Sequence, residues 1–119
     1  MGIAEFFKLR FRKKVQSAGF LKQALISIKT LCEKAENLGP AYSGEKEQLW
    51  RIYDDLNKVK PEENPTAIKF EHTILEKATL SGSLCDKAII GKDSGEFKNS
   101  VQLLGNSVNQ RKNFENSEG

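Results

Sequence analysis

Few side chains in this sequence are suited to catalysis or to metal binding. His72 is the single histidine, and Cys32 and Cys85 are the only cysteines. A structural zinc site needs four ligands at short paired spacings and a facial iron site needs two histidines, so one chain supplies neither set. On one helix, Cys85 and His72 would be about 20 Å apart and on different faces, which excludes a nucleophile and base pair. The cysteines are expected to be buried free thiols.

Two pairs of adjacent carboxylates, Asp54-Asp55 and Glu62-Glu63, remain as candidates for acid and base chemistry. Neighbouring side chains diverge on a helix or in a turn, so we interpret these pairs as solvated charges. Gly91-Lys92 is not the end of a phosphate-binding loop, because Asp86 occupies the position of its first glycine. The sequence predicts a protein that is not an enzyme and that has no cofactor, no metal and no small-molecule substrate.

Glycine, proline and capping residues divide the chain into four helical segments. The first stops at Gly39-Pro40, and Ser43 is a candidate N-cap for the second. Asn64 precedes a proline at the first position of the third, and the "DSGE" stretch resembles a capping box for the fourth. The expected helices therefore cover residues 1–38, 43–60, 65–90 and 93–111, and the tail of residues 113–119 is expected to be disordered.

Apolar residues recur at helical spacing in every segment. The expected core positions are Leu21, Ala24, Leu25, Ile28, Leu31, Cys32, Ala35, Leu38, Leu49, Ile52, Tyr53, Leu56, Val59, Ala67, Phe70, Ile74, Ala78, Cys85, Ala88, Phe97, Val101, Leu104 and Val108. Each helix must bury one apolar stripe against the others. The fold class predicted is all-α: an antiparallel bundle of three to four helices in one domain, residues 1–112, whose first helix is long and bent or phase-shifted near Gly19.

The third segment contains the small-residue stretch "ATLSGS", Ala78 to Ser83. Small residues allow two helices to approach closely, and Gly82 costs about 1 kcal/mol relative to alanine inside a helix. We expect a tight helix crossing there, with a kink or a shallow groove as the alternative. Trp50 lies on the flank of the second segment and either rims the core or, with Tyr42, marks a contact surface.

The beginning of the chain does not share the core stripe of the first segment. Continued backwards along a straight helix, that stripe reaches Arg10, Lys13 and Lys14, which cannot extend a dry core. The apolar residues of this part form their own stripe, rotated by roughly 100°; they are Ala4, Phe7, Phe11, Val15 and Ala18. Residues 1–17, called the basic arm below, are therefore predicted to form a separate amphipathic helix.

Charge is divided in the same way. Residues 1–32 contain seven basic residues and one acidic residue, whereas the rest contains 12 basic and 15 acidic residues. The predicted partner-binding residues are Phe7, Lys8, Arg10, Phe11, Arg12, Lys13 and Lys14. The arm either folds back onto the bundle with its charges solvated, lies on an anionic membrane, or binds an acidic protein.

Self-association would also cover the phenylalanines of the arm. A nucleic-acid-associated accessory protein is less favoured, because the other three helices show no basic face. No window approaches the roughly 18 apolar residues that cross a bilayer. The sequence therefore predicts a cytoplasmic interaction or adaptor module that is membrane-peripheral if its arm binds lipid.

Overall fold

The computed structural model describes the backbone of residues 2–61 and 64–118 and the side chains of residues 19–61 and 64–114. The elements are α1 (Gly2–Ala35), a short 3-10 helix η1 (Pro40–Tyr42), α2 (Ser43–Asn57), α3 (Pro65–Ile89) and α4 (Glu96–Glu118). Within the described ranges there is no strand, and the four α-helices pack against one another, which confirms the all-α bundle.

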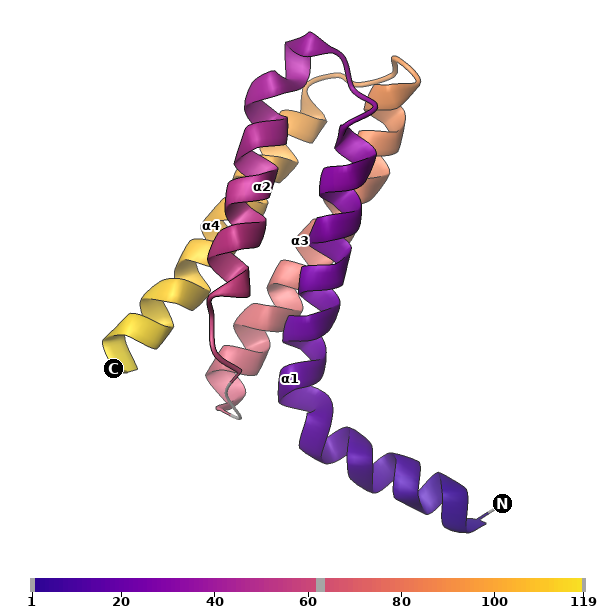
Figure 1. The fold of residues 1–119 in the computed structure, drawn as a ribbon, viewed down its shortest axis with the longest axis vertical. Coiled ribbons are helices and arrows are strands. Elements are labelled where there is room, and N and C mark those ends of the chain that lie inside the picture. The colour runs from indigo at the N-terminus through magenta and orange to yellow at the C-terminus, as the bar shows by residue number, and fades with distance from the viewer. Residues whose placement is uncertain (1, 62–63, 119) are drawn as a thin grey trace.

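The order of the helices around the bundle is α1, α2, α4, α3 (Figure 1). α2 packs against α1 and α4, and α3 packs against the same two helices; in the described part of the chain the backbones of α2 and α3 are not adjacent. The hairpins α1–α2 and α3–α4 are antiparallel, as expected, but α1 runs parallel to α3 and α2 parallel to α4. Two ion pairs between residues near like ends of these helices, Lys34–Asp86 and Lys112–Asp55, agree with this direction.

Local signals set most of the helix ends. The Asn64 side chain accepts a hydrogen bond from the Thr66 backbone N–H at 2.8 Å, which confirms the predicted cap of α3. Gly91 follows the end of α3 with a φ of +76°, a conformation that glycine adopts without strain. The prediction for Ser43 was wrong: it is the first residue of α2, and its hydroxyl donates to the Pro40 carbonyl.

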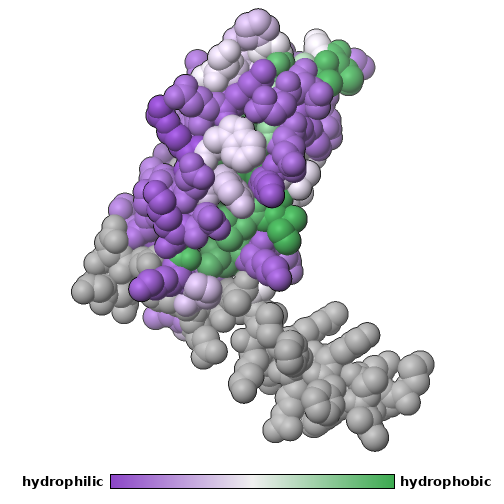
Figure 2. Space-filling view, viewed as in Figure 1, coloured by the Kyte–Doolittle hydropathy of each residue, from purple (hydrophilic) through white to green (hydrophobic). Residues whose placement is uncertain are grey.

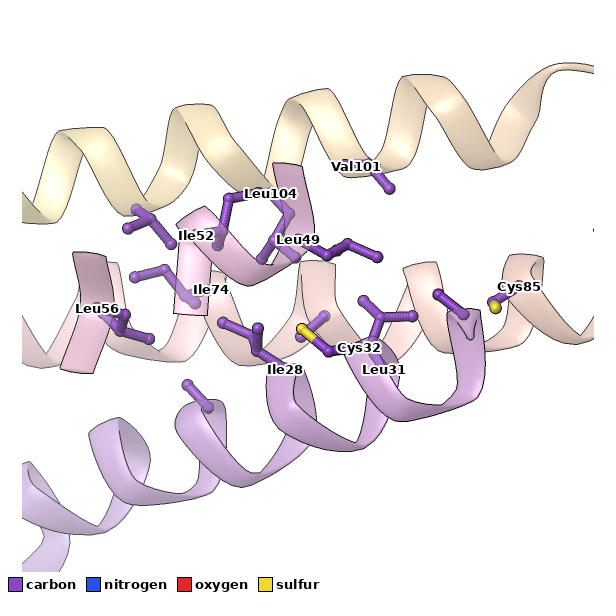
Figure 3. Close-up of a cluster of buried hydrophobic side chains, with 14 of the residues drawn as sticks. Ile28, Leu31, Cys32, Leu49, Ile52, Leu56, Ile74, Cys85, Val101 and Leu104 are labelled. Carbon is purple, nitrogen blue, oxygen red and sulfur yellow. The ribbon is translucent and has the colours of Figure 1, made fainter. Parts of the chain in front are cut away.

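Apolar side chains from all four helices fill the interior (Figure 3). Nearly all of the expected core positions are buried; Leu25, Tyr53 and Phe70 are half-buried. In Figure 3, Ile28 and Leu31 of α1 lie among Leu49 of α2, Ile74 of α3 and Leu104 of α4. The core therefore draws on every helix and holds the bundle together as one unit.

The row of buried positions along α3, called its seam below, also contains polar residues that the apolar pattern did not predict. Apart from Leu84, which lies beside Cys85, its buried positions recur at alternating spacings of four and three; they are Ala67, Glu71, Ile74, Ala78, Ser81, Cys85 and Ala88. The seam of α4 continues in the same way beyond Val108 to Arg111, which is fully buried. This spacing is that of a coiled-coil interface, so a charged residue occupies a core position on each of the two helices.

α1 is one continuous helix of 34 residues, about 51 Å long. Leu21 is its first buried residue among those whose side chains are described. Figure 1 shows the N-terminal part of α1 bending away from the axis of the bundle and projecting beyond it. The fold thus separates a helical segment at the start of the chain from the packed body.

The C-terminal part of α4 extends beyond its expected end. The sequence predicted fraying near Arg111 and a disordered tail from residue 113, whereas α4 is helical to Glu118. The ring of Phe114 lies 5.9 Å from that of Phe70 and 5.9 Å from the guanidinium carbon of Arg111. These contacts extend the packed interface past the last aliphatic residue of the seam.

The small-residue stretch of α3 packs as expected at some positions only. Ala78 and Ser81 are buried in the interface, in line with a close helix crossing. A Cβ added at Gly82, however, would meet no atom within 4 Å. The absence of a side chain at Gly82 is therefore not required by packing.

Candidate functional site

The predicted partner-binding residues all lie on the basic arm. The backbone of residues 2–17 is helical. The side chains of the predicted residues lie outside the described ones; they are Phe7, Lys8, Arg10, Phe11, Arg12, Lys13 and Lys14. The arm is thus a helix, and the described side chains nearest to it belong to the surface of the bundle.

The arm leaves the bundle next to an aromatic contact between α1 and α3. The ring of Phe20 lies 5.1 Å from that of His72 in an edge-on arrangement. His72 Nδ1 is 3.2 Å from Glu76 Oε1 one turn later on α3, and both side chains are more than half exposed. His72 therefore lies at the surface and contacts α1 at Phe20, three residues beyond the end of the arm.

A second group of side chains lies where α2 meets the C-terminal half of α1. Trp50 Nε1 donates a hydrogen bond to Glu36 Oε1 at 3.2 Å, and the rings of Trp50 and Tyr53 are 6.1 Å apart and nearly perpendicular. Trp50 remains 37% exposed. We call Trp50, Tyr53, Glu33, Glu36 and Asp54 the aromatic–acidic face. Tyr42 is not part of it, because Tyr42 contacts Phe97 and Asp93 instead.

The carboxylates of this face influence a thiol buried beneath it. Burial and, to a smaller extent, the charge of Glu36 raise the pKa of the Cys32 thiol to about 12. Asp54 and Glu33 act in the same direction. Glu33 on α1, Glu36 in the turn after α1 and Asp54 on α2 therefore all lie close enough to Cys32 to disfavour its thiolate.

Figure 2 shows the side of the bundle on which α1 and α2 lie in front. Most of this surface is hydrophilic, but an apolar area is visible between the two helices. Leu25 and Tyr53 are half-buried residues that pack against the core on these helices. Apolar and hydrophilic side chains therefore occur together on this side of the molecule.

The most unusual polar group of the body is buried between α3 and α4. Arg111 Nε donates to Glu71 Oε2 at 2.9 Å, and Arg111 Nη2 donates to the Lys60 carbonyl at 2.8 Å. Neither charged side chain is exposed to solvent. The arrangement joins the connection that follows α2 to α3 and α4, and it has a structural role. The signal in the sequence was that Glu71 and Arg111, which carry opposite charges, fall on the buried spacing of α3 and of α4.

The opposite end of the bundle is held by a hydrogen bond between its two connections. The Tyr42 hydroxyl donates to Asp93 Oδ2 at 2.8 Å, and Asp93 Oδ1 accepts from the N–H groups of Gly95 and Phe97. Partial desolvation would raise the pKa of Asp93, but these hydrogen bonds outweigh it and hold the pKa below its ordinary value. Asp93 thus caps α4 and positions Tyr42 against the core.

The two carboxylate pairs of the sequence do not converge on a site. Asp54 is exposed, and Asp55 Oδ2 lies 3.3 Å from the Lys112 ammonium group on α4. Asp55 therefore forms an ion pair between helices. Glu62 and Glu63 lie outside the described residues.

Neither cysteine is placed for chemistry at the surface. Cys32 and Cys85 are free and buried, and burial raises the pKa of both thiols. Among the described side chains there is no group of three or more residues suited to hold a metal ion. None of the helices searched in the described part combines the length and hydropathy of a bilayer-spanning segment.

Comparisons with known protein families, with curated proteins and with solved structures gave no match.

Proposed function

We propose that this protein is a non-enzymatic interaction module that docks on an anionic membrane surface through its basic arm. The observation that carries the proposal is that α1 continues as a helix beyond the bundle (Figure 1). That projecting segment contains five of the chain's basic residues within "FFKLRFRKK". A helix free of the body can lie flat on a surface.

The composition of the arm suits the interface between lipid headgroups and acyl chains. At 100° per residue, Phe7 and Phe11 fall on one stripe, and Lys14 and Arg10 fall on its flank. Such a helix places its aromatic side chains among the acyl chains and its cations at the headgroups. Each cation near an anionic leaflet contributes about 1 kcal/mol, and added salt weakens this attraction.

Flotation with vesicles tests this function. The full chain is expected to bind vesicles that contain phosphatidylserine, to lose binding as salt is raised, and not to bind purely zwitterionic vesicles. Arg10→Glu with Lys14→Glu should abolish binding. Phe7→Ser with Phe11→Ser should weaken it without altering the net charge.

Equal and negligible binding of the wild type and these variants would reject the membrane function. Salt-sensitive capture of an acidic protein, with no vesicle binding, would assign the arm to a protein partner instead. A shift of duplex or single-stranded nucleic acid at low salt would favour the nucleic-acid alternative.

A further inference from the structure

We propose that the basic arm of one chain docks on the aromatic–acidic face of a second copy, so that two chains form a reciprocal pair. This inference uses the same arm as the proposed function but does not require membrane binding. It assigns a protein surface to the arm when no membrane is present.

The face offers the chemistry that a basic aromatic helix needs. Trp50 is held in place by Glu36 yet stays 37% exposed, and Tyr53 meets it edge-on. Glu33, Glu36 and Asp54 are all exposed. Arg51 on the same helix pairs with Glu47 at 2.8 Å. Glu36 contacts the exposed indole ring of Trp50 directly, and Asp54 lies one helical turn after Trp50 on α2.

The arm is complementary to that face in charge and in side-chain type. Its five cations within "FFKLRFRKK" oppose the three carboxylates. Guanidinium and ammonium groups bind favourably over the faces of tryptophan and tyrosine rings. The phenylalanines of the arm would then contact aromatic surface rather than water.

The continuity of α1 directs the arm to another molecule. Glu36 lies 17 residues beyond Gly19, about 26 Å along the helix axis from the base of the arm. To reach its own face the arm would have to reverse its direction at its base. An unbroken helix from Gly2 to Ala35 does not allow such a reversal. The arm of a second copy can reach the face without any reversal of its own helix.

Analytical ultracentrifugation of the full chain, with Trp50 fluorescence, tests the proposal. Trp50 is the only tryptophan, so its quenching by acrylamide reports on the face alone. We expect dimers at low salt, dissociation at high salt, and less quenching in the dimer than in the monomer. Arg10→Glu with Lys14→Glu should raise the dissociation constant by about tenfold or more.

A face variant and a matched control separate this contact from general charge effects. Glu33→Gln with Asp54→Asn leaves the bond between Glu36 and Trp50 in place and should weaken the dimer by about tenfold. Gln102→Lys with Asn106→Lys makes the same change in net charge on exposed positions of α4 and should leave the dimer unchanged. The arm variant and the face variant, when mixed, should form a mixed pair through the one intact contact.

The outcomes distinguish this inference from the proposed function. The face variant should keep vesicle binding, whereas the arm variant should lose both vesicle binding and dimerisation. A chain that stays monomeric up to about 1 mM at low salt overturns the inference. So does a dimer that responds to neither variant, or Trp50 quenching that does not change with concentration.

Discussion

Arg111 Nε and Glu71 Oε2 are 2.9 Å apart, with both side chains fully removed from solvent. Removing one member of such a pair leaves the other charge buried without that counter-ion. Arg111→Met should therefore lower the free energy of unfolding by about 3–5 kcal/mol, measured by urea denaturation. The double variant Glu71→Leu with Arg111→Met removes both charges and should recover most of that loss.

The exposed pair of Arg51 and Glu47 provides the control for this measurement. Its side chains are 74% and 69% exposed, so Arg51→Ala should change the free energy of unfolding by less than about 0.5 kcal/mol. An Arg111→Met variant no less stable than Arg51→Ala would contradict the structural role assigned to the buried pair.

Gly82→Ala should stabilise the protein. Gly82 lies inside α3, and an added Cβ would meet no atom within 4 Å, so the helix gains about 1 kcal/mol of propensity without a clash. Thermal and urea unfolding measure the change. Gly91→Ala is the matched control: it should destabilise by about 1–2 kcal/mol, because Gly91 has a φ of +76°. A loss of stability in Gly82→Ala would show that α3 needs the glycine.

The bond between Tyr42 and Asp93 should make stability depend on pH at both extremes. The pKa of Asp93 is lowered from 3.8 on folding, so its contribution is present above that pH and is lost as the pH falls through the folded value. The hydrogen bond to Asp93, followed by desolvation, raises the pKa of Tyr42 above 10.0. The contribution of Tyr42 is therefore present below pH 10.0 and is lost as the pH rises through the folded value.

NMR titration of the Asp93 carboxyl group checks this assignment. Tyr42→Phe should move the pKa of Asp93 upward, because it removes one of the hydrogen bonds that favour the charged carboxylate. Tyr53→Phe, which alters a tyrosine on another surface, should leave that pKa unchanged. A Tyr42→Phe titration that matches the wild type would contradict the assignment.

Both thiols should resist labelling in the native protein. Burial and the charge of Glu36 raise the pKa of Cys32 to about 12, and burial raises the pKa of Cys85, so little thiolate exists at pH 8. Reaction with Ellman's reagent should follow the rate of unfolding and become fast in urea. Rapid labelling of either cysteine under native conditions would show that it is accessible.

The sequence predicted the parts of the fold that depend on local chemistry. Asn64 and Pro65 set the start of α3, and Gly91 marks its end, because capping and left-handed backbone act through a few neighbouring residues. Apolar spacing identified nearly all of the core. The burial of Glu71 and Arg111 was missed, since charged residues are almost never fully buried unless they are paired.

Helix order depended on information that local patterns do not contain. α2 and α3 are adjacent in the sequence but are not neighbours in space, since each packs against α1 and α4 instead. In the sequence only Trp50 of the aromatic–acidic face was a candidate contact residue, because Glu33, Glu36 and Asp54 come from α1, the turn after it and α2. Whether the arm carries function stays a prediction.

The alternating directions of the four helices give the molecule two different ends. The arm leaves from the end where α4 finishes, whereas Tyr42 and Asp93 close the other (Figure 1). A bundle anchored through its arm would therefore hold the Tyr42 and Asp93 connections farthest from the anchoring surface. A fluorophore placed at Ser94 would measure the height of the far end of the docked protein above the surface. One placed at Asn113, in the C-terminal part of α4, would measure the height of the end nearest the arm.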